Sequence, residues 1–158
     1  MLRPTISLLL LVAVTALPAT AAAATSSDSS AVMAVVHQFI DGFNKGDTKS
    51  GLAACDATET DIIDEFPPHH WESCTAWMNA YAASAKAAGD TDGWVTLGKP
   101  WSLDVSGNVA YVVAPSTFAY KEKGKSVNET GSVFTLVLIK SAGGWHIRAW
   151  TWSKNKVS

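Results

Sequence analysis

The sequence contains little charge, few cysteines and no apolar run long enough to span a membrane. Only 16% of the 158 residues are charged, the formal net charge at pH 7 is −2, and there are two cysteines. Domains that bind nucleic acid are usually strongly basic, so we expect no nucleic-acid partner. Hydrophobic residues make up 47% of the chain, which excludes intrinsic disorder, and the length fits a single domain.

Sequence motifs for common cofactors are also missing. The chain has no phosphate-binding loop, no dinucleotide fingerprint, no G-x-S-x-G motif and no EF-hand loop. His69 and His70 are adjacent, and neighbouring residues rarely converge on one ion. The sequence therefore predicts no metal and no cofactor.

The N-terminal segment has the pattern of an export signal. Arg3 precedes an apolar core from Leu8 to Leu17, and Pro18 and a run of small residues up to Ala24 follow. A retained membrane anchor is the weaker interpretation, because the apolar core falls short of about 20 residues. We predict a signal peptide over residues 1–24 and an exported protein, periplasmic or secreted, that makes no membrane contact after cleavage.

Export changes the interpretation of the two cysteines. In an oxidising compartment, Cys55 and Cys74 are expected to form a disulfide rather than to remain free thiols or metal ligands. The bridge closes a loop of about 20 residues. No local motif supports a nucleophilic cysteine.

Helical periodicity dominates the first half of the mature chain. Residues 25–30 are predicted to be a flexible lead-in, and residues 31–155 a single domain. A first helix is predicted from apolar residues at helical spacing, namely Val32, Val35, Val36, Phe39, Ile40 and Phe43. Asp47 can cap a short second helix over 48–54, and a third helix over 72–88 is predicted to stop at Gly89.

Strand periodicity dominates the second half. A short strand over 60–66 is followed by Pro67 and Pro68. After Asp92 the period becomes two, with turn residues between runs, which predicts strands over 94–104, 109–121, 126–140 and 145–154. Sequential strands with short turns predict an antiparallel meander. The fold class is α+β, with the helices on one face of the sheet.

Three segments resemble the nuclear transport factor 2-like superfamily, which includes ketosteroid isomerase, scytalone dehydratase and the SnoaL-like polyketide cyclases. Residues 39–47 are similar to the end of its first helix, residues 62–71 to its first strand and turn, and residues 144–153 to its last strand. The resemblance implies a curved antiparallel sheet wrapped around three N-terminal helices, a cone-shaped, cystatin-like roll. It also implies an apolar pocket, with dimers through the sheet, and enzymes that place one acid and one or two polar donors in the pocket.

The candidate acid lies in the segment that follows Asp61. Strand alternation would put Asp64 on one face with Ile62 and Phe66, and Glu65 on the other. Desolvation raises the pKa of an inward carboxyl, which suits a general base. We favour Asp64 as that base; the alternative is that both acids flank the strand in water. His70 is the candidate donor, its alternative being a residue of a polar surface turn.

Aromatic residues supply the candidate pocket wall. Trp71, Trp77, Met78 and Tyr81 are expected to line the pocket, or to build the core. On the last strand, alternation places Trp145 on one face and Trp150 and Trp152 on the other. Tryptophan on both faces favours a homodimer through the sheet, with an aromatic ligand site as the second interpretation.

Three functions are consistent with this pattern. The first is an exported pocket protein that binds a small apolar ligand. The second is an isomerase, dehydratase or cyclase that uses Asp64 as base and His70 or Tyr81 as donor. The third is a dimeric module that binds a protein partner through its sheet.

Overall fold

The computed structural model describes residues 26–158, so the predicted signal peptide lies outside the described residues. The elements are α1 (Ser26–Lys45), α2 (Thr48–Ala53), β1 (Asp61–Ile63), β2 (His70–Trp71), α3 (Cys74–Ala88), β3 (Asp90–Leu97), β4 (Ser102–Ser106), β5 (Val109–Glu122), β6 (Lys125–Ser141), β7 (Gly144–Ser153) and β8 (Lys156–Val157). Within residues 26–158, no helix is both long enough and apolar enough to cross a membrane.

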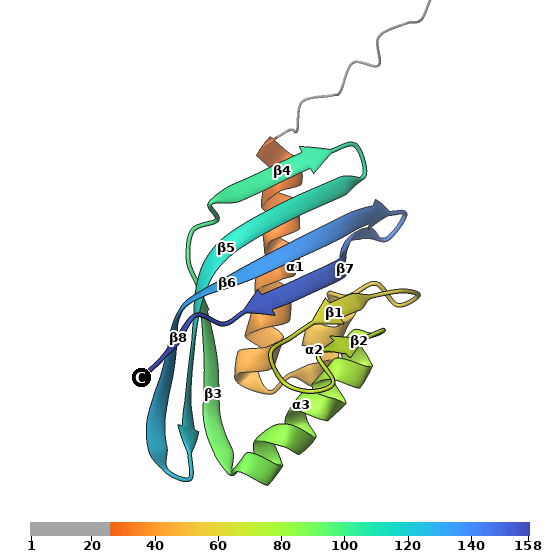
Figure 1. Ribbon diagram of the computed structural model, residues 1–158. Coiled ribbons are helices and arrows are strands. Elements are labelled where there is room, and N and C mark those ends of the chain that lie inside the picture. The colour runs from red at the N-terminus through yellow and green to blue at the C-terminus, as the bar shows by residue number, and fades with distance from the viewer. Residues whose placement is uncertain (1–25) are drawn as a thin grey trace, which may run out of the picture.

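The helix α1 carries the apolar stripe that its sequence predicts. Val32 and Val36 are fully buried, and Phe39 and Ile40 nearly so. Figure 1 shows α1 lying across the sheet formed by β4 to β7. The helix begins at Ser26, so the prediction of a flexible lead-in over 25–30 is wrong for residues 26–30. An ion pair of 2.6 Å between Asp28 and Lys140 on β6 holds this first turn against the sheet.

The eight strands within residues 26–158 form one curved sheet (Figure 1), and the α+β fold class is confirmed. The order is β2-β1-β7-β6-β5-β3, with β4 also paired to β5 and β8 to β6. The sheet is mixed, because β1 runs parallel to β7, which corrects the prediction of a fully antiparallel sheet. The strand predicted over 94–104 is in fact two strands. Gly98 and Pro100 lie between β3 and β4, and a proline cannot donate to a strand ladder.

A β-bulge in β6 changes which side chains face inward. Ser116 pairs with Ser132, and Phe118 pairs with Glu129, so β6 has one more residue than β5 in this interval. Gly131 lies there with a φ of 69°, a backbone conformation that favours glycine. The extra residue exchanges the faces of the strand, and both Ser132 and Glu129 are buried.

A second bulge has the same effect in β7. Leu138 pairs with Ile147 and Val137 pairs with Ala149, which leaves Arg148 as the extra residue of β7. Trp145, Ile147, Trp150 and Trp152 all turn their side chains toward the helices in consequence, and none of the four is exposed. The prediction that Trp145 lies on the face opposite to Trp150 and Trp152 is therefore wrong.

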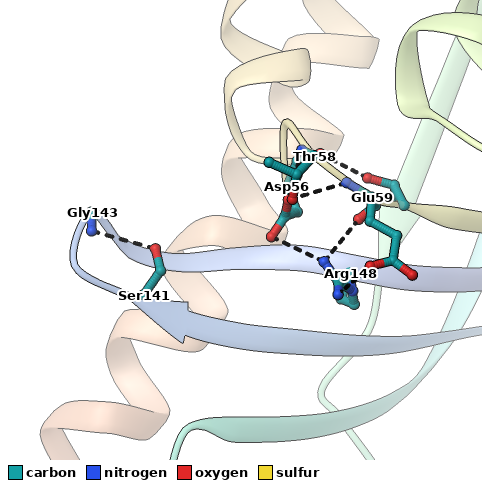
Figure 2. A network of polar contacts seen from close by, with 7 residues as sticks. Asp56, Thr58, Glu59, Ser141, Gly143 and Arg148 are labelled. Atoms are coloured by element: carbon teal, nitrogen blue, oxygen red, sulfur yellow. Dashed lines mark hydrogen bonds and ion pairs between the residues drawn. The ribbon is translucent and has the colours of Figure 1, made fainter.

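The bulge residue Arg148 anchors the loop that leads into β1. Its guanidinium pairs with Glu59 and lies 3.5 Å from Oδ2 of Asp56. Oδ1 of Asp56 accepts hydrogen bonds from the backbone and hydroxyl of Thr58, and these bonds hold the Asp56 pKa below its ordinary value. Figure 2 shows this network beside β7, with the Ser141–Gly143 hydrogen bond of the β6–β7 turn nearby.

The predicted disulfide between Cys55 and Cys74 is confirmed. Cys55 follows α2, and Cys74 is the first residue of α3. Their Cα atoms are 6.5 Å apart, and both residues are buried. The bridge therefore links the segment that follows α2 to the start of α3.

Replacing both cysteines, Cys55→Ser with Cys74→Ser, should lower the free energy of unfolding by about 3 kcal/mol, because the closed loop regains its freedom in the unfolded chain. Urea unfolding followed by circular dichroism measures the change. Thiol titration of the unfolded, unreduced wild type should find no free thiol. Two free thiols, or a double variant as stable as the wild type, would contradict the prediction.

Candidate functional site

A cavity of about 80 Å³ lies between α1, α3 and the inner face of the sheet. Nine of its fourteen lining residues are aromatic, two are aliphatic and three are acidic. The aromatic residues are Phe39, Phe43, Phe66, Trp77, Tyr81, Phe118, Phe134, Trp150 and Trp152; the others are Ile40, Val95, Asp64, Glu65 and Glu129. A cavity with apolar walls and a few converging polar groups is the usual form of a ligand site.

The aromatic walls are held in place by ring contacts with one another. Trp77 of α3 lies at the centre, with its ring centroid 4.7 Å from that of Trp150 and 5.7 Å from that of Tyr81. Phe43 of α1 contacts Tyr81 at 5.1 Å. Such pairs each add about 1 kcal/mol beyond the area they bury, so these walls form part of the folded core.

Asp64 extends into this aromatic environment. Its Oδ2 accepts a hydrogen bond of 2.7 Å from the indole nitrogen of Trp77, and its Oδ1 accepts one from the backbone N–H of Glu65. Burial raises the pKa of the Asp64 carboxyl above its ordinary value, and the Trp77 bond opposes that shift. A carboxylate in this environment can accept a proton from a bound molecule.

Glu65 and Lys154 form an ion pair beside Asp64. Nζ of Lys154 lies 2.6 Å from Oε1 of Glu65, and the two side chains are 35% and 29% exposed, so they lie where the cavity meets solvent. Burial raises the pKa of Glu65, against the effect of the Lys154 bond. The pKa of Lys154 is also raised: burial acts against its charge, and its bonds to Glu65 and Glu129 outweigh that effect.

Glu129 is a third acid of the cavity that the sequence analysis missed. Its side chain is 1% exposed. Oε1 accepts hydrogen bonds from the Trp152 indole at 2.7 Å and from the Ser132 hydroxyl at 3.1 Å, and Oε2 lies 3.3 Å from Nζ of Lys154. Counted back from the buried end of β6, simple alternation puts Glu129 on the outer face. Gly131 is the one sequence signal for the bulge that turns Glu129 inward.

Tyr81 provides a hydroxyl on the α3 side of the cavity. Burial, with the nearby charges of Asp90 and Asp64, raises its pKa to about 12. The phenol therefore remains protonated at neutral pH and can donate a hydrogen bond to a ligand oxygen.

Solved structures show what this arrangement is similar to. A nuclear transport factor 2-like superfamily protein from Salmonella enterica aligns with a TM-score of 0.72 at 19% identity, covering 84% of this chain and 94% of that one. The fold is that of the nuclear transport factor 2-like superfamily. A ketosteroid isomerase-like protein from Erwinia carotovora aligns with a TM-score of 0.67 at 16% identity, over 84% and 99% of the two chains.

The nuclear transport factor 2-like fold occurs in enzymes as well as in proteins of unknown function. A hexachlorocyclohexane dehydrochlorinase aligns with a TM-score of 0.70 at 10% identity, over 85% of this chain and 92% of its own. No protein-family model and no curated protein matches the chain. Identities this low establish the fold and leave the chemistry to the site residues.

The structure brings some predicted site residues to the cavity of this nuclear transport factor 2-like fold and leaves others outside. Trp77 and Tyr81 line it, as do both Asp64 and Glu65. The expectation that alternation separates these acids fails because β1 ends at Ile63, and residues beyond a strand do not follow its period of two.

Three predicted residues do not line the cavity. His70 is exposed on β2, and its Nε2 lies 3.1 Å from the Asp61 carboxylate, so it is not the polar donor of the pocket. Trp71 is buried against Phe66, with ring centroids 4.6 Å apart. Met78 packs against the core. Within residues 26–158, no three His, Cys, Asp or Glu side chains are grouped to hold a metal ion.

The stability of the Asp64→Asn variant, measured relative to that of the wild type, should increase as the pH rises from 3 to 7. The raised pKa of Asp64 means that the folded state favours the protonated carboxyl, so the wild type loses stability as the pH rises from the ordinary value of 3.8 through the raised one. The Asn variant lacks this loss. The altered hydrogen bonds of the variant change the free energy of unfolding by the same amount at every pH. The pH dependence of the difference between variant and wild type therefore reports the ionisation of Asp64 alone.

Urea unfolding of both proteins at several pH values measures the difference. Asp104→Asn, which removes an exposed acid on β4, is the control, and its difference from the wild type should stay nearly constant. A relative stability of Asp64→Asn that stays flat or falls with pH would contradict the prediction.

Proposed function

We propose that the protein is an exported single-domain protein that binds a small hydrophobic molecule in the cavity between α1, α3 and the sheet. The observation that carries this proposal is the aromatic lining, with nine of fourteen residues aromatic. Trp150 and Trp152 both face inward and belong to that lining. They therefore support the interpretation as an aromatic ligand site and not the one that relied on tryptophan at both faces of β7. The Cys55–Cys74 disulfide supports export, because structural disulfides persist in oxidising compartments.

The cavity volume limits the size of the ligand. A cavity of about 150 Å³ holds one benzene molecule, whereas this cavity encloses about 80 Å³. A ligand the size of benzene is therefore enclosed only in part. A longer molecule would have to extend past Glu65 and Lys154 into solvent.

Native mass spectrometry of protein purified gently from the exported fraction of its own host should show a small-molecule adduct. Val95→Phe should reduce the bound fraction by about tenfold or more, because the added ring occupies the cavity. Val109→Phe, the same change at an exposed position of β5, is the control. An adduct that is equally abundant in both variants would show that the ligand binds elsewhere. Protein without any adduct would count against the proposal.

A second function, an isomerase, dehydratase or cyclase, is favoured by one observation: Asp64 is a carboxylate of raised pKa at the wall of an apolar cavity. Asp64→Asn should lower kcat by about 10²- to 10⁴-fold, which is the contribution of a general base, and should leave the circular dichroism spectrum unchanged. Turnover of the molecule identified in the adduct measures this effect. Glu65→Gln, which keeps Asp64, should retain most activity, and full activity in Asp64→Asn would rule out Asp64 as the base.

The homodimer through the sheet stays a prediction, and with it the third function of a protein-interaction module. Exposed apolar side chains alternate with buried residues on β5, where Val109 is 41% and Tyr111 45% exposed. An interface requires apolar surface of this kind. The same native mass spectra report the number of subunits.

A further inference from the structure

The polar side of the cavity is strongly acidic. Asp64, Glu65 and Glu129 line it, and within residues 26–158 no Lys, Arg or His does. Lys154, beside the cavity, pairs with Glu65 and Glu129. Three carboxylates thus share one ammonium group in a place where solvent screens charge poorly, and this imbalance disfavours an anionic ligand.

The acids of the cavity accept hydrogen bonds from neighbouring groups or form ion pairs with them. The two oxygens of Asp64 accept N–H groups from Trp77 and Glu65. Oε1 of Glu129 accepts two further donors, and its Oε2 faces Lys154. Hydrogen bonds donated to a carboxylate favour its charged form. These bonds oppose the burial that raises the pKa of Asp64 and Glu65, and a cation nearby would oppose it further.

The rest of the wall suits the opposite charge in a ligand. The faces of aromatic rings attract cations, and this attraction is strongest where water is excluded. Trp77, Trp150 and Trp152 belong to the lining, and two of them donate their indole N–H groups to the acids. Aromatic side chains and carboxylates thus line one small volume.

The third indole of the lining has an unpaired N–H group. Trp150 is 4% exposed, and its Nε1 is buried with no hydrogen-bond partner among residues 26–158. Buried N–H groups in folded proteins nearly always have a partner. Trp150 lines the cavity, and we assign the oxygen of a ligand as the acceptor of this group.

A metal ion is a poor candidate for the positive charge. The part of the chain that the structure describes contains no convergent group of three acidic, His or Cys side chains that could hold one. An ammonium group makes smaller demands on geometry, because it can bind through charge and through aromatic faces.

We propose that the ligand is a small amino alcohol or amino ether, whose ammonium group lies on the side of the cavity lined by Asp64, Glu65 and Glu129 and whose aliphatic body lies against the aromatic walls. The oxygen of the ligand accepts the free N–H of Trp150. This inference rests on the proposed function, because it names the class of molecule that the same cavity binds.

Two probes of equal size test the charge requirement. In 2-amino-2-methylpropan-1-ol and 2,2-dimethylpropan-1-ol the skeleton and the hydroxyl are the same, and an ammonium group in the first replaces a methyl group in the second. Titration of ¹⁵N-labelled protein at pH 7, followed through the tryptophan indole N–H signals, gives both affinities. The amine should bind about tenfold or more tightly than the alcohol, and the Trp150 signal should shift.

Charge-neutralising variants locate the effect. Glu129→Gln should reduce the preference for the amine about threefold or more. Glu129 is buried and bonded to Trp152, so its replacement can lower the stability of the fold. Glu65→Gln, at the more exposed cavity mouth, is therefore a second variant that should lower stability less. Asp104→Asn removes the same charge from an exposed position of β4 and should leave the preference unchanged.

The outcomes separate this inference from the proposed function. Equal or tighter binding of the alcohol would overturn the cation inference and support a neutral hydrophobic ligand in the same pocket. Binding of neither probe would overturn the inference and count against the pocket as well. A preference for the amine that survives both Glu→Gln variants would place the amine outside the pocket and overturn the inference.

Discussion

Side chains alternate between the two faces of a β-strand, and bulges in β6 and β7 decide which of them face the interior of this protein. Any residue added to one strand of a pair exchanges the inner and outer faces beyond it. The extra residue near Gly131 turns Glu129 inward, and the extra Arg148 turns Trp150 inward. Without the two insertions the acid and the indole would lie on the outer face, and the cavity would lose much of its polar and aromatic lining. Arg148 also pairs with the loop that leads into β1, and Asp64 directly follows that strand.

A buried carboxylate is costly unless donors surround it, and here the donors come from side chains that also build the cavity. Glu129 is compensated by Trp152, Ser132 and Lys154. Asp64 is compensated less completely, and burial keeps its pKa above the ordinary value. Proteins retain such uncompensated groups mainly where function requires them, because replacing them commonly adds stability. This raised pKa is the reason why Asp64, rather than Glu129, is the acid that we propose as a general base.

Local rules predicted those parts of the fold that depend on local patterns. The apolar stripe of α1, the stop of α3 at Gly89 and the Cys55–Cys74 pairing all follow from spacing or compartment. The missed features depend on long-range pairing. The parallel contact of β1 with β7 joins segments far apart in the chain, and Glu129 reaches the cavity only through register with β5. Inward and outward positions counted along one strand cannot show that this strand has one residue more than its neighbour. Gly131 is the sequence feature that indicates such a bulge in β6.

The fold does not determine the chemistry, since one scaffold carries both enzymes and proteins without known activity. Charge and size at the cavity restrict the choice further. A neutral polycyclic molecule would place apolar surface beside three carboxylates and would extend well beyond a cavity of about 80 Å³. An anion would be repelled by those same acids. A compact molecule with one positive charge meets both restrictions, and its ammonium group would also stabilise the ionised form of Asp64, lowering the pKa that burial raises. Binding and proton transfer at this site would therefore be coupled through a single carboxylate.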